Sequence, residues 1–302
     1  MMMEILKILF LISCGFCLLA CKPAVETSLF SGEHALAETA ALVKIVPRES
    51  GTGGARRAAV HLETRMQEIG VPAVIDTFKD QTPAGEMYFH NVVGRLPGKT
   101  SRLIVIGSHF DTKSGIAPDF QGANDSGSSS GVLLEMIRVL KSRAPYETEF
   151  MFAFFDGEEC LKQYNMMTDG LHGSRRLAKE VYTAGGAQFV EAVIILDMIG
   201  DKNLNVTIPR NSSRKLTKEL FAAADELGHR AKFGLARGDI IDDHVPFLAL
   251  GMPVINLIDF EYGSAPGLND YWHTPEDTMD KLSVESLQII GDTVLRMIER
   301  LQ

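Results

Sequence analysis

The chain has 302 residues, of which 45% are hydrophobic and 23% are charged. This composition is typical of a globular protein and excludes the collagen-like, disordered and multi-span membrane classes. The 30 lysines and arginines against 39 acidic residues give a formal net charge of −9, so nucleic acid is not expected as a partner.

The N-terminal segment predicts a secretory signal rather than a part of the fold. Residues 5–20 are nearly all apolar, and this stretch is too short to span a bilayer comfortably. It ends in Leu-Leu-Ala before Cys21, and a small residue before a cysteine after an apolar stretch resembles a bacterial lipobox. We therefore expect a signal peptide over residues 1–20, a lipid on Cys21 and a polar tether over residues 21–32. A plain secretory signal and an N-terminal anchor helix are the alternatives.

The expected location is the bacterial cell envelope, on its periplasmic or extracellular side, with the protein attached to the membrane through Cys21. The next residue is Lys22 rather than the aspartate associated with inner-membrane retention, which favours the outer membrane. Of the four cysteines, only Cys160 lies beyond the predicted signal and its lipidation site, so no internal disulfide is expected. We expect a single domain over residues 33–302 whose core is large enough without one.

Helices and strands are predicted to alternate along this domain. The apolar spacing first indicates two helices, the second of which ends at Gly70. Helices are predicted at residues 33–46, 55–69, 128–141, 173–182, 213–227 and 283–301, and strands at 71–78, 91–96, 103–108, 149–155, 192–196 and 254–258. This alternation is typical of an α/β fold with a mainly parallel sheet that helices cover on both faces.

Acidic and imidazole side chains follow four of the predicted strands, close to the point where each strand ends. In an open α/β sheet, functional sites form outside the carboxyl ends of the strands. Asp125 joins this group from the loop before the helix at 128–141. The residues that follow the strands are His109, Asp111, Asp156, Glu158, Glu159, Asp197 and His273.

So many carboxylates at one edge of a sheet predict a bound cation. Their mutual repulsion and desolvation cost several kcal/mol unless a cation compensates them. Histidine and carboxylate ligands without a thiolate suit zinc, ahead of manganese, cobalt or iron. Asp111 lies two residues after His109 and is expected to orient the imidazole of that histidine.

Five short motifs occur in a fixed order along the chain. They are residues 108–112 (Ser-His-Phe-Asp-Thr), 122–125 (Gly-Ala-Asn-Asp), 154–159 (Phe-Phe-Asp-Gly-Glu-Glu), 196–200 (Leu-Asp-Met-Ile-Gly) and 272–274 (Trp-His-Thr). Together they resemble the zinc aminopeptidase superfamily, which also contains the animal-type glutaminyl cyclases. The resemblance covers about residues 35–300. It implies a three-layer α/β/α sandwich around a central mixed sheet, the phosphorylase/hydrolase-like zinc exopeptidase fold.

The glutaminyl cyclase branch of this superfamily implies a site with one zinc ion. The cyclase zinc ligands match Asp125, Glu159 and His273 in this chain. The residues that match Asp197 and Asp242 form a hydrogen bond with each other in the cyclases instead of binding a second metal.

The two-metal aminopeptidase branch implies a second zinc ion. There, the positions of His109 and Asp197 complete the second site, and the position of Asp125 bridges both metals. The position of Glu158 is the general base that activates a metal-bound water. In the cyclase branch, Glu158 is expected to take the proton of the substrate amine instead. All ligands of both schemes are present, so ligand identity leaves both branches open.

Secondary features favour the cyclase branch. The acidic motif has the cyclase form, Asp242 stands where aminopeptidases usually have serine, and Trp272 matches the tryptophan that walls the cyclase substrate site. Tyr164 stands roughly where the cyclases have a second active-site tryptophan, so Tyr164 and Trp272 are expected to contact substrate. We predict a zinc-dependent acyltransferase that converts the N-terminal glutamine of peptides or proteins to pyroglutamate and releases ammonia. The alternatives are a two-zinc aminopeptidase and a non-catalytic peptide-binding lipoprotein.

Overall fold

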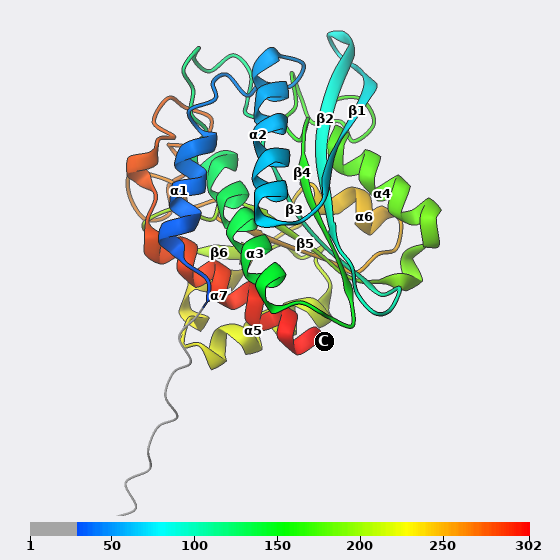
Figure 1. Cartoon of the computed structure of the whole chain (residues 1–302). Helices are drawn as coiled ribbons and strands as arrows, with labels where there is room; N and C mark the ends of the chain where they lie inside the picture. Colours follow the sequence, from blue (N-terminus) through cyan, green and yellow to red (C-terminus); the bar gives the residue numbers. More distant parts are fainter. Residues whose placement is uncertain (1–28) are drawn as a thin grey trace, which may run out of the picture.

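An eight-stranded mixed sheet runs through the computed structural model, which describes residues 29–302 (Figure 1). The strand order is β1-β2-β4-β3-β5-β8-β6-β7. The strands are β1 (Ala73–Thr82), β2 (Gly85–Leu96), β3 (Leu103–His109), β4 (Glu149–Phe155), β5 (Val190–Asp197), β6 (Val206–Ile208), β7 (Phe233–Leu235) and β8 (Val254–Ile258). The helices are α1 (Gly32–Leu42), α2 (Gly53–Ile69), α3 (Ser129–Arg143), α4 (His172–Gly185), α5 (Arg214–Glu226), α6 (His244–Ala249) and α7 (Val284–Leu301). The predicted signal peptide and Cys21 lie outside the described residues.

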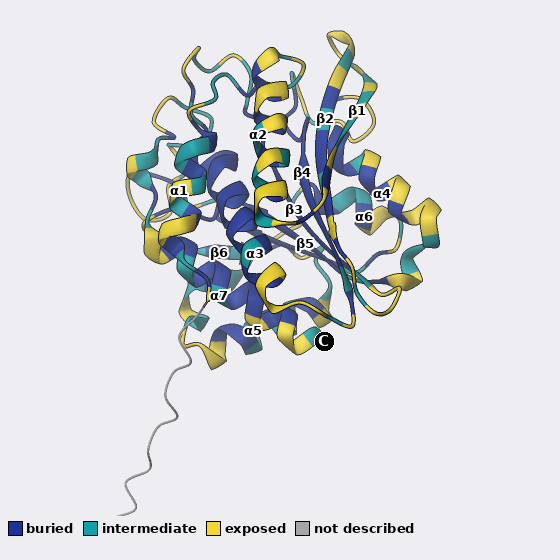
Figure 2. Ribbon diagram, in the orientation of Figure 1, coloured by how far each residue is buried: buried dark blue, intermediate teal, exposed yellow. Residues whose placement is uncertain are grey.

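Helices cover both faces of the sheet, because alternate side chains of each strand point to opposite faces. Along β4, Phe150 and Phe152 belong to the core on the side of α1, α2, α3, α5 and α7. Met151 and Ala153 belong to a second core on the side of α4 and α6. In Figure 2 the central strands and the inner faces of the helices are correspondingly buried. The predicted α/β fold, with a mixed sheet between two helical layers, is confirmed.

Four neighbouring strands in the centre of the sheet, β4, β3, β5 and β8, run parallel. They are almost entirely buried, and a strand buried on both faces is a continuous apolar run rather than an alternating one. Their registers align His109 with Phe155, and Asp197 with Ile258. The carboxyl ends of all four strands therefore meet at one edge of the sheet, where the predicted site residues lie.

Helix α2 shows how local sequence sets the limits of an element. The Thr52 side chain accepts hydrogen bonds from the N–H groups of Gly54 and Ala55 at the start of the helix, which satisfies donors that have no partner within the helix. Gly70 ends it with a φ of 88°, a left-handed conformation that glycine adopts at little cost. The predicted helix end at Gly70 is confirmed.

The edges of the sheet differ from the prediction. The structure adds β6 and β7, and β2 begins at Gly85 instead of residue 91. Both added strands are only three residues long, too short for a hydrophobic period to reveal them. The first half of β2 is largely exposed, so its sequence lacks the apolar run that identifies the central strands.

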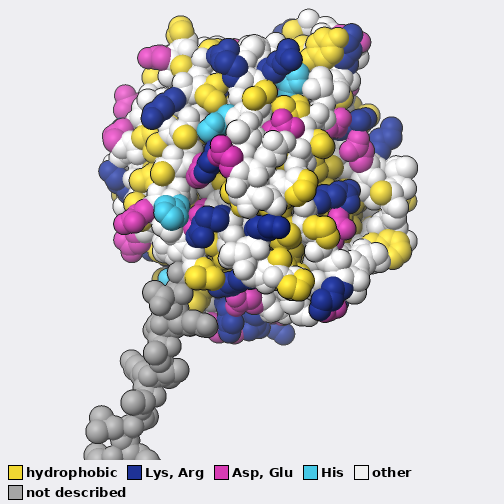
Figure 3. All heavy atoms as spheres, viewed as in Figure 1, with side chains coloured by type: hydrophobic (Ala, Val, Ile, Leu, Met, Phe, Trp, Pro, Cys, Tyr) yellow, Lys and Arg dark blue, Asp and Glu magenta, His cyan; other side chains and the backbone are white. Residues whose placement is uncertain are grey.

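The surface carries charges of both signs. Figure 3 shows acidic and basic side chains interspersed over the face that carries α1 and α2. Exposed ion pairs of this kind each contribute little to stability, about 0–1 kcal/mol. Within residues 29–302, none of the helices is both long and apolar enough to cross a membrane.

Candidate active site

The carboxyl ends of β3, β4, β5 and β8 bring the predicted metal ligands together. These side chains form two groups, each with ligand atoms that lie within 4.8 Å of one another, and Asp125 belongs to both. Asp125 comes from the turn at Ala123–Ser128, directly before α3. The first group is Asp125, Glu159 and His273, and the second is His109, Asp125 and Asp197.

The first group fits a zinc ion. His273 Nε2 lies 2.9 Å from Glu159 Oε1 and 3.3 Å from Asp125 Oδ2. Glu159 Oε2 is buried and has no hydrogen-bond partner among residues 29–302, although the Lys113 ammonium lies 3.4 Å away. The ammonium partly balances the charge of this oxygen, but no hydrogen bond occupies its lone pairs, so the oxygen can accept a metal ion. Three protein ligands with nitrogen and carboxylate donors suit catalytic zinc, which keeps a fourth position open.

The second group surrounds the imidazole of His109. His109 Nε2 lies 3.2 Å from Asp125 Oδ1 and 3.2 Å from Asp197 Oδ1. All three side chains are buried. The structure therefore retains the donor atoms that a second metal would need beside the first.

Asp197 and Asp242 do not form the hydrogen bond with each other that the cyclase resemblance implies. Within the described chain, Asp242 instead accepts hydrogen bonds from the backbone N–H of Asp243 and from Asn256 Nδ2, the latter at 2.6 Å. The Asp197 carboxylate contacts His109. Sequence reasoning missed Asn256, although a polar residue inside the apolar strand β8 is itself a signal.

Asp111 holds the turn after β4 as well as facing His109. Its Oδ1 lies 3.5 Å from His109 Nδ1, which is beyond a good hydrogen bond. Its two carboxylate oxygens accept the backbone N–H groups of Glu158 and Glu159, each at 3.2 Å. Asp111 therefore mainly binds the backbone of the acidic turn. Its contact with His109, by which it was expected to orient the imidazole, is weaker.

Glu158 is a buried carboxyl group with a hydroxyl donor. Tyr164 Oη donates a hydrogen bond to Glu158 Oε1 at 2.6 Å. Burial raises the pKa of Glu158 well above its usual range, and the charges of Glu159 and Asp242 raise it further, while His109 lowers it. A buried carboxyl group with a raised pKa suits general acid–base chemistry near neutral pH.

The acidic neighbours of the two candidate ligand histidines, His273 and His109, raise their pKa values. Burial opposes the protonated form of His273, but its hydrogen bonds to Asp125 and Glu159 raise its pKa to about 9. The pKa of His109 is also raised, against the effect of burial, by its acidic neighbours. Burial, and then the charge of Asp242, raise the pKa of Asp197 to about 7. These buried acids thus need protons or a cation to balance them.

A small cavity of about 90 Å³ opens onto these side chains. Trp272 forms one wall, stacked on His273 with ring centroids 4.0 Å apart, and Phe260 meets Trp272 edge-on at 5.7 Å. Tyr164 and Ile241 also line the cavity. Acidic groups beside an aromatic and aliphatic wall are suited to a ligand with an amine and a short side chain.

Two residues of the site have a left-handed backbone although they are not glycines. They are His273, with a φ of 54°, and Met198, with a φ of 50°, directly after Asp197. This conformation costs about 1–2 kcal/mol for a residue with a side chain. Such strain persists only where the surrounding structure holds it, and it is concentrated at functional sites.

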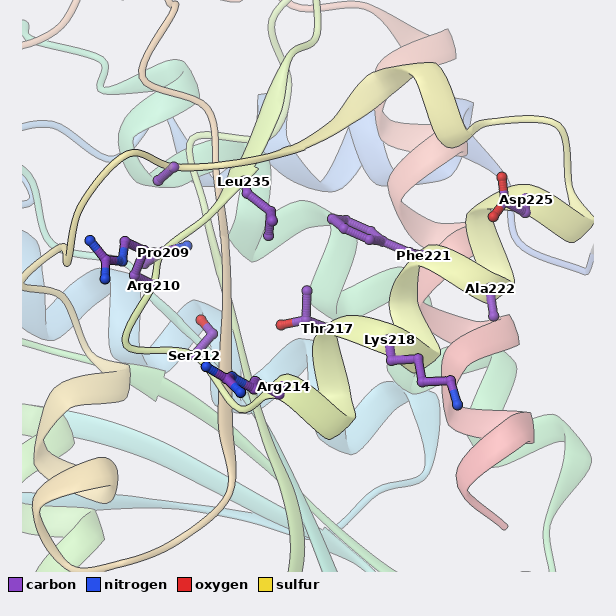
Figure 4. Close-up of a pocket in the computed structure, with 11 residues that line it drawn as sticks. Pro209, Arg210, Ser212, Arg214, Thr217, Lys218, Phe221, Ala222, Asp225 and Leu235 are labelled. Atoms are coloured by element: carbon purple, nitrogen blue, oxygen red, sulfur yellow. The ribbon is translucent and has the colours of Figure 1, made fainter.

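A larger cavity, of about 780 Å³, lies along α5 (Figure 4). Arg210, Arg214 and Lys218 line it together with Phe221. The residues that line it include a single acid, Asp225. The larger cavity therefore lacks the histidine–carboxylate groups, and the smaller cavity, which has them, is the candidate active site.

The three-layer sandwich, with a buried histidine–carboxylate site at the carboxyl ends of its parallel strands, has the zinc exopeptidase fold. The model of the Peptidase family M28 matches residues 91–298, and the chain belongs to this family.

Known relatives of the chain include cyclases and an exopeptidase. The glutaminyl-peptide cyclotransferase-like protein of Bos taurus is 31% identical, over 81% of this chain and 70% of that protein. A glutaminyl cyclase structure from an Acidobacteriales bacterium is 34% identical, with a TM-score of 0.84, and the match covers 93% of this chain and 98% of that one. A Zn-dependent exopeptidase structure from Parabacteroides distasonis is 26% identical, with a TM-score of 0.78, over 89% and 98% of the two chains.

Proposed function

We propose that this protein is a zinc-dependent glutaminyl-peptide cyclotransferase, which converts an N-terminal glutamine to pyroglutamate and releases ammonia. The observation that carries the proposal is the small cavity, in which Glu158 and the group of Asp125, Glu159 and His273 face the Trp272 wall. The similarity to cyclotransferases over most of the chain supports it.

Asp125, Glu159 and His273 would hold the zinc ion. When bound, zinc supplies Lewis-acid polarisation of the γ-amide carbonyl of the substrate. The α-amine of the same glutamine is the nucleophile, so no water takes part. Because attack is intramolecular, the entropic part of the barrier is small once Trp272 and the cavity walls hold the side chain in a folded conformation.

Glu158 moves the proton that this reaction has to transfer. Its carboxylate accepts a proton from the attacking α-amine and returns it to the departing ammonia. Tyr164 Oη holds Oε1 of this carboxylate, so the other oxygen is available to the substrate. Asp242, fixed by Asn256, adds negative charge beside Asp197 and Glu158, which favours a protonated Glu158 after the first transfer.

Mass spectrometry of one reaction tests the proposal. The zinc-loaded protein is incubated with a peptide that begins with glutamine, beside a control without enzyme. Loss of one ammonia, faster than in the control, is the expected result. An unchanged peptide, or loss of the whole first residue, would contradict it.

A two-zinc aminopeptidase is the second candidate, and the His109, Asp125 and Asp197 group favours it. In that reaction Glu158 accepts a proton from water, and the acidic groups receive the free α-ammonium of the substrate. Metal analysis separates the candidates, since one zinc per chain supports the cyclase and two support the peptidase.

We also propose that Cys21 carries a lipid that attaches the protein to the bacterial cell envelope, with the outer membrane favoured. The support is the sequence before Cys21 and the nature of Lys22. Labelling of expressing cells with a radioactive fatty acid tests this. Label in the wild type but not in Cys21→Ser is the expected result, and equal label in both would contradict it.

A further inference from the structure

Residue 277 binds three consecutive backbone N–H groups in the segment that carries Asp125. The Asp277 carbonyl oxygen accepts from the N–H of Ala123 at 3.3 Å. Asp277 Oδ1 accepts from Asn124 at 2.7 Å, and Oδ2 accepts from Asp125 at 3.1 Å. Asp277 is fully buried, so these hydrogen bonds do not compete with water. One residue therefore fixes the backbone of the first half of the turn, up to and including Asp125.

The same residue is close in sequence to a second predicted ligand. Asp277 lies four residues after His273, and its N–H donates to the carbonyl oxygen of Thr274 at 3.1 Å. The turn that follows His273 is thus closed by Asp277 itself. Because His273 Nε2 and Asp125 Oδ2 lie 3.3 Å apart, the separation of these two donor atoms depends on the contacts of Asp277.

Two further buried groups hold Asp277 and the turn it binds. Tyr262 Oη donates to Asp277 Oδ1 at 2.7 Å, and Tyr262 is fully buried. The buried guanidinium of Arg48 donates to the carbonyl oxygens of Phe110 and Gly122, each at 3.0 Å, and its positive charge acts on Asp277. The carboxylate therefore has three hydrogen-bond donors and a compensating charge, which makes its position well defined.

We propose that Asp277, held by Tyr262, is a positioning residue that sets Asp125 against His273 and Glu159 for metal binding. Ligand side chains need such support, because a donor atom displaced by a fraction of an ångström loses much of its affinity for the metal. This inference rests on the zinc site of the proposed function. Asp277 and Tyr262 act through the metal ligands and do not contact the substrate in this proposal.

Two substitutions remove hydrogen bonds of Asp277 while they keep the size and packing of the side chains. Tyr262→Phe removes only the hydroxyl that holds Asp277. Asp277→Asn leaves one acceptor oxygen for three donors and turns an NH₂ group toward one of them. The matched control is Tyr146→Phe, because the Tyr146 hydroxyl is buried and has no hydrogen-bond partner among the described residues.

Zinc affinity, measured on the whole protein by competition with a chromophoric chelator, is the primary readout. We expect about 10- to 100-fold weaker zinc binding in Tyr262→Phe and Asp277→Asn, and wild-type affinity in Tyr146→Phe. Circular dichroism checks that each variant is folded. Excess zinc should restore the rate of Tyr262→Phe, since the residue acts through the metal site and not through the chemical step.

Each result decides for or against the inference. Zinc affinity within twofold of wild type in Tyr262→Phe would overturn it, as would an equal loss in Tyr146→Phe. If Asp277→Asn does not fold, Tyr262→Phe decides alone. A wild-type protein that binds no zinc would contradict the proposed function as well. A wild type that binds zinc normally beside unaffected variants would contradict only the role of Asp277.

Discussion

Replacement of Tyr164 by phenylalanine tests whether its hydroxyl or its ring serves the reaction. The ring packs tightly against Gly170, where an added Cβ atom would meet Tyr164 Cδ1 at 2.8 Å, and phenylalanine keeps this packing. The hydroxyl donates to Glu158 Oε1 at 2.6 Å, and phenylalanine removes that contact alone. If Tyr164 serves only as a wall of the substrate cavity, the substitution should change kcat little. If its hydroxyl supports Glu158 as the base, kcat should fall strongly.

The geometry of the contact gives the size of the effect. A hydrogen bond to a charged group contributes about 1.5–3 kcal/mol. Since about 1.4 kcal/mol corresponds to a tenfold change in rate, loss of the contact at the transition state lowers kcat about 10- to 150-fold. KM should change little, because the aromatic surface that faces the substrate is retained.

Initial rates of ammonia release from a glutaminyl peptide, measured across substrate concentrations with saturating zinc, give kcat and KM separately. Tyr182→Phe is the matched control, because Tyr182 is an exposed residue of α4. A kcat for Tyr164→Phe within twofold of wild type would refute the reasoning and would leave the ring as the functional part of the residue.

Three further changes test the site and its surroundings. Glu158→Gln should keep zinc but lower kcat at least about a hundredfold, because the amide cannot accept the proton; survival of the activity would make the assignment of the base wrong. Asp242→Ser should abolish cyclisation, whereas an aminopeptidase would keep its rate of residue release. Burial lowers the pKa of His244 to about 4, so below about pH 6.5 the unfolded state binds a proton that the native state excludes. Stability should therefore fall by about 2 kcal/mol between pH 7 and pH 5 from this residue. His244→Leu should lack that part of the fall in urea unfolding, and an equal fall in both proteins would contradict it.

The centre of the fold could be predicted from the sequence because its strands are buried on both faces. The strand predicted at residues 254–258 coincides with β8, and the one at 149–155 coincides with β4. Continuous apolar runs identify such strands without any knowledge of their neighbours. The short strands β6 and β7 have no comparable signal, since their pairing depends on tertiary contacts and not on local pattern.

The candidate site could be predicted for a related reason. Carboxylates and histidines directly after buried strands are rare unless they are used, and the parallel strands bring them to one edge. His109 and Asp197 are the last residues of β3 and β5, so their meeting follows from the topology alone. The detailed contacts did not follow, as the separate hydrogen bonds of Asp197 and Asp242 show.

Asp277 escaped prediction because it acts through backbone contacts across long loops. Asp277 lies 152 residues from Asp125 along the chain, and nothing in the local sequence around it differs from an ordinary polar turn. Asp111 was predicted by its spacing from His109, yet its closer contacts are with the N–H groups of the acidic turn. A ligand is recognised by the chemistry of its own side chain, whereas a supporting residue is recognised only by which backbone atoms it reaches. Substitutions at such supports should therefore affect metal affinity first, and the chemical step only through it.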